Sequence, residues 1–318
     1  MKRIATSIIF VLAIAGCVGQ TTGTTQIDIA DVMVTENQPI IPSQPTAGGT
    51  FTFRALVKNQ HGSEFAENVE VELFDSGKCL PTAVNDDKSR GGKVPVTLLE
   101  PTKFAPGQQE LIKVDFDAPT SDQIVGLSAV CPIRYKASYN FDAKTEMGID
   151  VASTDRLKQI ETETGQRPAG ESRTNIGPGP LRILMTPKTV LPAETGKKFQ
   201  FEISVKNDGN GNAPEGTIEK GKWKITIPSD FTPDPSVEGL SQEGSGTLCN
   251  DKFVKSGDGY ANTAPIQFVQ GQTNAITCYL VAPGEDKVPV EKLYTFSSNI
   301  DDYTYEYFGQ QVDVTIKP

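Results

Sequence analysis

The sequence predicts an all-β protein with two similar antiparallel β-sandwiches in tandem, joined by a short helix and a Pro/Gly-rich linker. Three observations predict this fold. Blocks of sequence recur in the two halves in the same order, apolar and polar residues alternate inside these blocks, and glycine and proline separate them. Alternation with a period of two indicates strands that bury one face. Short strands between regular turns are typical of β-sandwiches.

The recurring blocks indicate a duplication. They pair residues 48–59 with 196–207, 104–119 with 268–283, and 135–142 with 294–301. Apolar residues occupy alternate positions in each block, as Phe51, Phe53 and Val57 do in the first. Because three matches in one order are hard to obtain by chance, we interpret the two halves as copies of one module.

The predicted boundaries follow from these blocks. We expect a signal peptide over residues 1–16, a flexible tether over 17–26, a first sandwich over 27–151, a helix and linker over 152–180, and a second sandwich over 181–318. The helix is predicted from Ser153 to Glu163, because serine caps helices and Gly165 can end this one. Turn-forming glycine and proline then alternate over residues 176–180.

The N-terminus predicts export and a lipid anchor. Lys2 and Arg3 precede an apolar run from Ile4 to Ile14, which has the length of a signal-peptide core and is too short to span a bilayer. The following small residues and Cys17 resemble the lipobox of prokaryotic lipoproteins. The resemblance implies that Cys17 carries a lipid, which holds the protein on the outer face of the cytoplasmic membrane or in the cell envelope.

The remaining four cysteines divide evenly between the halves. We expect the disulfides Cys79–Cys131 and Cys249–Cys278, since an even pair per half in an exported protein favours disulfides. In the second repeated block Cys278 aligns with Val114, so its side chain should point into the core. Metal binding by these cysteines is not expected, because the chain has neither CxxC spacing nor histidine partners.

Charge and composition argue against several functions. The net charge of −10 would repel phosphate, so no nucleic-acid partner is expected. His61, the single histidine, lies in a predicted turn, where we expect it on the surface. With one histidine, a Ser-His-Asp triad and the usual zinc sites are not expected in this chain. No phosphate-binding loop or nucleophile elbow is present either, so we do not expect an enzyme.

One segment has the spacing of a calcium-binding loop. Oxygen-bearing side chains occupy positions one, three, five and twelve of such a loop, at Asp208, Asn210, Asn212 and Glu219. The glycine that the sharp turn requires at position six is replaced by Ala213. A plain turn rich in small polar residues is the favoured interpretation, and calcium binding is the alternative.

Near the C-terminus, Tyr303, Tyr305 and Tyr307 alternate on one face of a predicted strand. Tyrosine combines apolar area with a polar hydroxyl, so the three could bind a partner or a sugar. Aromatic pairs across strands also stabilise sheets, and this structural interpretation is favoured.

The segment from Val57 to Leu73 and the later turn at residues 106–108 resemble the CARDB-type domains. The second copy is similar, with an insertion before Trp223. These domains are immunoglobulin-like sandwiches of bacterial and archaeal surface proteins, and the resemblance implies a spacer, adhesive or binding module without catalytic residues. We therefore expect a non-catalytic, lipid-anchored surface protein of a prokaryote, in our expectation an archaeon. Its two modules would serve adhesion, envelope structure or binding of a surface protein or glycan. The alternative is capture of a glycan or calcium by the second module.

Overall fold

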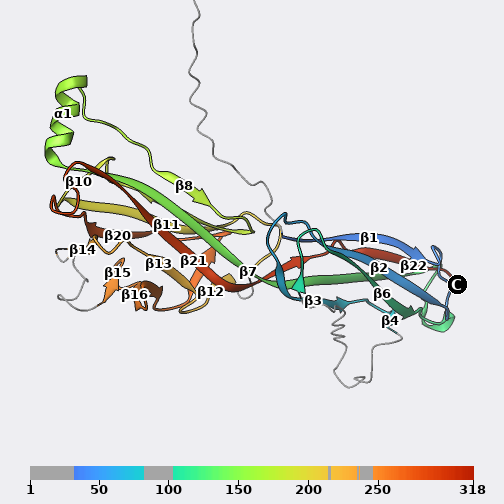
Figure 1. Ribbon diagram of the computed structural model, residues 1–318. Coiled ribbons are helices and arrows are strands. Elements are labelled where there is room, and N and C mark those ends of the chain that lie inside the picture. The colour runs from blue at the N-terminus through green and yellow to red at the C-terminus, as the bar shows by residue number, and fades with distance from the viewer. Residues whose placement is uncertain (1–31, 82–102, 214–215, 235, 237–245) are drawn as a thin grey trace, which may run out of the picture.

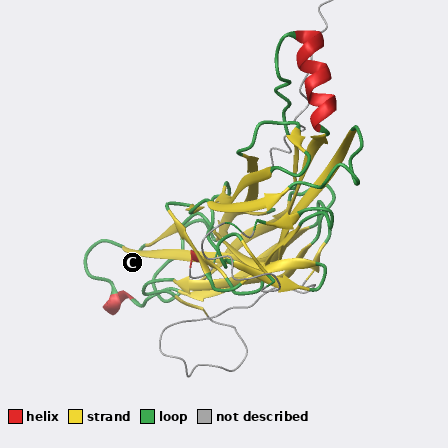
Figure 2. Ribbon diagram, turned by 90° about the vertical axis from the view of Figure 1, so that its left-hand side faces the viewer, coloured by secondary structure: helices red, strands yellow, loops and turns green. Residues whose placement is uncertain are grey.

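The computed structural model of the chain describes residues 32–81, 103–213, 216–234, 236 and 246–318 (Figure 1). Antiparallel strands dominate this part, and the ribbon coloured by secondary structure shows one α-helix at its edge (Figure 2). The predicted all-β class with antiparallel sandwiches is therefore confirmed. No helix among the described residues is long and apolar enough to cross a membrane.

The first sandwich packs a four-stranded sheet against part of a larger one. The four-stranded sheet has the order β1 (Met33–Ile41), β2 (Thr50–Asn59), β6 (Gln109–Asp117) and β4 (Leu80–Pro81). It faces β3 (Ala66–Asp75), β5 (Lys103–Phe104) and the first part of β7 (Ala129–Ala152). Alternate residues of β2 are buried, and Phe53 packs edge-on against Tyr135, with 5.3 Å between ring centroids.

The second sandwich repeats this arrangement. One sheet contains β9 (Leu181–Pro187), β11 (Lys198–Asn207), β12 (Thr217–Ile218), β14 (Thr232–Pro233), β18 (Ile266–Val269), β19 (Gln272–Thr273) and β20 (Ile276–Val281). The facing layer contains β13 (Trp223–Thr226), β15 (Thr247–Leu248), β16 (Phe253–Ser256), β17 (Gly259–Asn262) and the first part of β21 (Glu291–Phe308). Phe201 and Phe296 meet between the layers, with 5.6 Å between ring centroids.

Strand pairing supports the duplication inferred from sequence. Phe53 pairs with Val114 in the first sandwich, and the equivalent Phe201 pairs with Cys278 in the second. Val114 and Cys278 are both buried, so the predicted inward position of Cys278 is confirmed.

Both predicted disulfides are present, and they attach at different places in the two copies. Cys79 lies in the turn before β4 and is bonded to Cys131 near the start of β7. Cys249 lies in the turn between β15 and β16 and is bonded to Cys278 on an inward position of β20. The two copies therefore share a sandwich but not a common disulfide position.

Two long strands run through both sandwiches (Figure 1). β7 has 24 residues and β21 has 18. Residues 291–300 of β21 pair with 143–152 of β7 in the second sandwich, and residues 303–308 pair with 136–141 in the first. The last strand, β22 (Val312–Ile316), continues along β7 by pairing with residues 129–133. The sandwiches are thus joined by a continuous two-stranded ribbon.

The ribbon is a reciprocal exchange between the two copies. The third repeated block lies within β7 in the first sandwich, over residues 135–142, and within β21 in the second, over 294–301. Each strand then continues into the other sandwich. The crossing point is a bulge where Asp142 on β7 lies opposite Asp301 and Asp302 on β21. Asp142 and Asp301 are also the aligned last residues of the block, so the exchange is symmetric about this point.

The exchange changes the domain boundaries. Residues 143–152 belong to the second sandwich and residues 303–316 to the first, so neither predicted range, 27–151 or 181–318, contains all the strands of one sandwich. The reason is that apolar alternation continues past Asp142 without a turn signal. Alternation predicts a strand but does not say against which sheet the strand will lie.

The predicted helix is present, but it does not lie between the sandwiches. α1 (Thr154–Thr164) begins at Ser153, whose Oγ accepts a hydrogen bond from the backbone N–H of Arg156 (3.3 Å), and ends at the left-handed Gly165. It follows β7 and stands at the outer end of the second sandwich (Figure 1). β8 (Arg173–Ile176) then pairs with residues 145–148, and β10 (Ala193–Glu194) pairs with the end of β7.

We predict that Cys278→Val leaves the fold intact, because valine fills the equivalent buried position at Val114. The loss in unfolding free energy should be about 3.5 kcal/mol, the contribution of a disulfide of this loop length. Cys278→Asp should be far more destabilising, because it buries an uncompensated charge. Thermal melts of the full chain compare the two variants. Equally mild effects would show that this side chain does not lie in the core.

Candidate functional site

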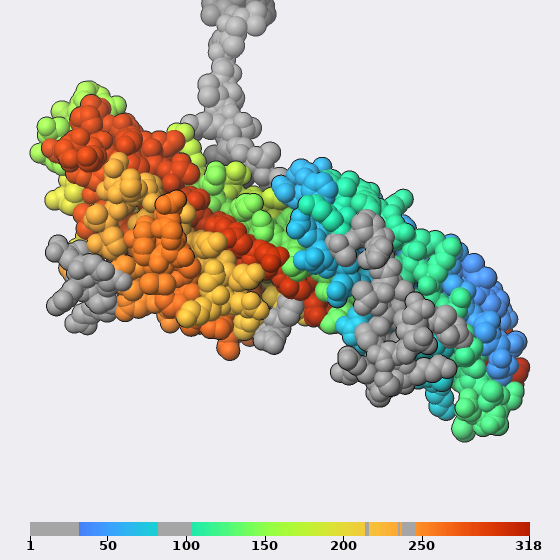
Figure 3. All heavy atoms as spheres, turned by 60° about the horizontal axis from the view of Figure 1, so that its bottom comes forward, coloured from blue at the N-terminus to red at the C-terminus, as the bar shows by residue number. Residues whose placement is uncertain are grey.

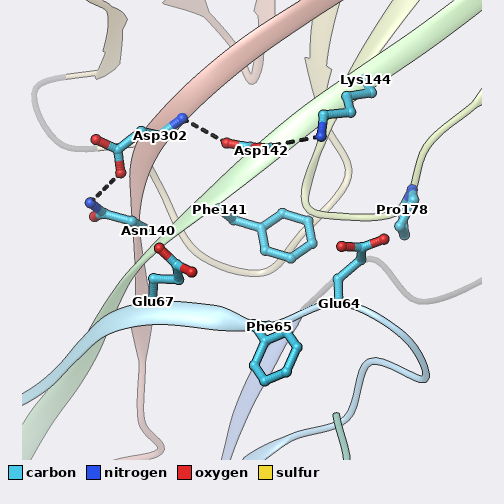
Figure 4. Close-up of a pocket in the computed structure, with 9 residues that line it drawn as sticks. All are labelled: Glu64, Phe65, Glu67, Asn140, Phe141, Asp142, Lys144, Pro178 and Asp302. Atoms are coloured by element: carbon cyan, nitrogen blue, oxygen red, sulfur yellow. Dashed lines mark hydrogen bonds and ion pairs between the residues drawn. The ribbon is translucent and has the colours of Figure 1, made fainter. Parts of the chain in front are cut away.

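A cavity of about 300 Å³ lies at the middle of the molecule, beside the point where the long strands cross (Figure 4). The loop before β3, β3 itself, the middle of β7, the loop after β8 and the bulge of β21 contribute to its walls. They supply Glu64, Phe65, Glu67, Asn140, Phe141, Asp142, Lys144, Pro178 and Asp302. Both sandwiches therefore form this site, and neither would have it alone.

The polar groups of the cavity bind one another across the bulge. Asn140 donates to Asp302 Oδ1 (2.6 Å), and the backbone N–H of Asp302 donates to Asp142 Oδ1 (2.8 Å). Lys144 lies 3.4 Å from Asp142 Oδ2, and Lys222 lies 3.3 Å from Asp302 Oδ2. These contacts neutralise the negative charges of both aspartates and stabilise the bulge between β7 and β21. Their geometry supports a structural role at the junction.

His61 packs behind this cavity, and its prediction as a surface residue is wrong. Its side chain is only 3% exposed, and its ring lies edge-on to Phe141, with 6.0 Å between centroids. Nδ1 accepts hydrogen bonds from the backbone N–H groups of Ser63 (3.2 Å) and Glu64 (2.7 Å). Burial lowers the pKa of the imidazole. The neutral ring therefore stabilises the turn through these two hydrogen bonds, and both require that the side chain of His61 points inward.

The proposed calcium-loop residues serve other contacts. Asp208 is held by two cations, with Arg182 Nε at 3.2 Å and Lys206 Nζ at 2.5 Å. Asn212 pairs through its backbone with Glu306 of β21, Asn210 is exposed, and Glu219 is exposed after β12. Among the described residues, no group of three or more His, Cys, Asp or Glu side chains could hold a metal ion. The segment around Asp208 forms a turn that packs on β21 through the backbone of Asn212, and calcium binding stays an untested alternative.

The tyrosine residues lie in the core of the first sandwich. Tyr303 and Tyr305 are 8% and 0% exposed, and Tyr307 is partly buried against the same core. Tyr305 lies 5.8 Å from Tyr139 between ring centroids, and burial raises the pKa of Tyr303 well above its usual value. The partner-binding alternative is therefore wrong for Tyr303 and Tyr305. The sequence interpretation missed this burial because β21 enters the first sandwich, where the face of the strand that carries the tyrosines packs into the core.

Tyr305 also fixes the loop from the second sandwich. Its hydroxyl donates to Asn207 Oδ1 (2.9 Å) and accepts from the backbone N–H of Gly211 (2.9 Å). These contacts and the junction aspartates were not found from the sequence. The one available signal was the end of the third repeated block, because Asp142 and Asp301 mark the crossing point there. The predicted lipid-bearing residue, Cys17, lies outside the described residues.

Comparisons with known proteins do not establish a family. No protein-family model matches the chain. A phosphoglycerate kinase of Levilactobacillus brevis is 25% identical over 177 residues, which cover 53% of this chain and 41% of that protein. This chain thus spans less than half the length of that relative. A solved structure of collagen adhesin from S. aureus is 12% identical and overlaps 91% of this chain and 93% of that chain, with a TM-score of 0.13.

We predict that Gly211→Ala destabilises the protein by at least ~2 kcal/mol. A methyl group at this position would overlap the carbonyl oxygen of Glu306 and displace the loop from β21. Gly62→Ala, in the corresponding turn of the first copy, is the matched control, because no atom lies within 4 Å of its new methyl group. Its effect should stay within ~0.5 kcal/mol. Urea denaturation measures both, and equal effects would show that the loop does not pack on β21 as described.

Proposed function

We propose that this chain is a non-catalytic, lipid-anchored surface protein of a prokaryote, in which two sandwiches act as one stiff body. Such a body would serve adhesion, envelope structure or the binding of a surface partner. The observation that carries the proposal is the continuous ribbon of β7 and β21, because a protein that must hold a surface at a fixed position needs a joint that does not bend freely.

The joint differs from an ordinary connection between domains. Domains joined by a flexible linker move relative to each other by default. Here 16 residue pairs connect β7 and β21, ten on one side of the bulge and six on the other. Bending at the middle would separate paired backbone and the contacts of Asp142 and Asp302. These interactions support a rigid body in which the two sandwiches keep a fixed position relative to each other.

Location at the cell surface is supported by the disulfides and by the N-terminal sequence. Both pairs of cysteines form disulfides, which favours an oxidising environment outside the cytosol. The signal-like segment and Cys17 provide the means of attachment. The absence of catalysis remains a proposal. It is supported by the environment of His61, which is buried and serves as an acceptor in a turn, and by the mutual pairing of Asp142 and Asp302 in the junction cavity.

We predict that Cys17→Ser releases the protein from membranes, because the substitution removes the thiol that would carry the lipid. Cell fractionation should move the variant to the soluble fraction or the medium, and mass spectrometry should find a lipid adduct on the wild-type chain. Thr22→Ser, in the same segment, is the control and should stay with the membrane. Retention of Cys17→Ser in the membrane fraction would contradict the anchor.

We predict that the two sandwiches unfold in one transition. Trp223, the single tryptophan, is buried in the second sandwich and reports on that sandwich alone. Ile316→Ala opens a cavity in the first sandwich and should cost about 2–5 kcal/mol. The denaturation midpoint should fall equally by Trp223 fluorescence and by far-UV circular dichroism. Val190→Ala, at an exposed site, is the control. An unchanged Trp223 midpoint in Ile316→Ala would show that the sandwiches are independent.

A further inference from the structure

The outer end of the first sandwich exposes aliphatic side chains. Val125 and Leu127 are 88% and 92% exposed, the highest values among the large hydrophobic residues of the described chain. They lie in the loop after the short 3-10 helix η1 (Ser121–Gln123), which projects beyond the strands near the C-terminus (Figure 2). Three further exposed residues belong to the same end of the sandwich, namely Ile41, Leu80 and Val130. Figure 3 shows this end of the molecule in green and blue.

The loop is held in place rather than collapsed onto the surface. The backbone N–H of Thr120 donates to Gln123 Oε1 (3.0 Å), and Lys78 donates to the carbonyl oxygen of Gln123 (3.2 Å). Ile124 packs against the core of the sandwich. Gly126, with φ of 101°, then turns the chain between Val125 and Leu127. The segment that leads into Val125 and Leu127 is therefore anchored, and the two side chains lie exposed at the tip of the loop, which we call the apex.

The equivalent loop of the second copy carries more charged side chains and fewer exposed aliphatic ones. It follows the end of the second repeated block, as the first loop does, and covers residues 283–290 at the other end of the molecule. Its exposed residues include Glu285, Asp286 and Lys287, whereas Val288 is buried and Val290 is 56% exposed. The first loop thus exposes two aliphatic side chains and one charged residue, Asp122, whereas the second exposes one aliphatic side chain and three charged residues.

We propose that Val125 and Leu127 insert into the lipid bilayer that holds the chain. This inference rests on the proposed anchor at Cys17. A bilayer fits better than a protein partner, because valine and leucine are under-represented among the residues that dominate protein interfaces, where Trp, Tyr and Arg prevail. A convex apex also needs a deformable partner, and acyl chains provide one.

The anchor is long enough to allow this contact. Val32 lies near the middle of the molecule, where its carbonyl oxygen accepts from the backbone N–H of Gln60. The 15 residues from Cys17 to Asp31 can span at most about 50 Å. β1 runs from this point to the outer end, and its nine residues cover about 30 Å. The lipid can therefore enter the membrane directly below the apex while the acidic chain (net charge −10) remains outside.

The test uses the full chain with Cys17→Ser, so that no attached lipid contributes, and flotation with vesicles of zwitterionic phosphatidylcholine, which has no net charge. We expect measurable binding that is unchanged when NaCl is raised, because insertion is apolar. Val125→Asp with Leu127→Asp should reduce binding at least tenfold. Val190→Asp, at an exposed valine of the opposite end, is the matched control and should bind like its parent. Equal melting temperatures would show that all variants are folded.

Three results would overturn the inference. The Cys17→Ser chain could fail to float with vesicles, or the double aspartate variant could float as well as its parent. Alternatively, the parent could form a dimer in solution that the double variant abolishes, which would identify a second copy as the occupant of the apex. None of these results depends on whether Cys17 is lipidated. Failure of the anchor would instead be seen in cell fractionation of Cys17→Ser.

Discussion

The backbone pairing of β7 with β21 is the interaction on which the rest of the structure depends. Each sandwich lacks one of its strands until the other copy supplies it, so neither hydrophobic core closes without the ribbon. In exchanged assemblies of separate chains, the same arrangement links two subunits. Here one polypeptide contains both copies, and the link is intramolecular. The high effective concentration of tethered segments favours this internal pairing.

Several features that look unrelated follow from this exchange. Because β21 enters the first sandwich, its tyrosine face becomes part of that core, and Tyr305 reaches a loop of the second sandwich. Because the two ladders meet at an irregular point, Asp142 and Asp302 are held there by Asn140, Lys144 and Lys222. Asn140, Asp142, Lys144 and Asp302 also line the junction cavity. Two of its four acidic side chains, Asp142 and Asp302, are therefore explained by their contacts at the bulge.

Much of the fold could be predicted from sequence, because strands with one buried face leave a direct pattern. The alternation of Phe51 and Phe53, the cap at Ser153 and the inward position of Cys278 all rest on local geometry that the sequence expresses. The choice of the sheet against which a strand pairs does not leave such a pattern in the sequence. Nothing near Ala143 indicates that β7 continues into another sandwich, and nothing near His61 indicates that Phe141 will cover it. These errors share one cause, since each depends on contacts between residues distant in sequence.

The exchange also determines when each part of the chain can reach its final state during synthesis and export. The first sandwich contains the earliest strands and also the last one, and Asn37 hydrogen-bonds to Gln310, 273 positions later. A chain that emerges from its N-terminus must therefore hold β1, β2 and β6 incomplete until residue 316 has appeared. The usual order, in which the N-terminal domain folds first, cannot apply. The first sandwich therefore closes only after residues 303–316 have appeared, and a chain cut before Tyr303 leaves β1, β2 and β6 facing an incomplete sheet.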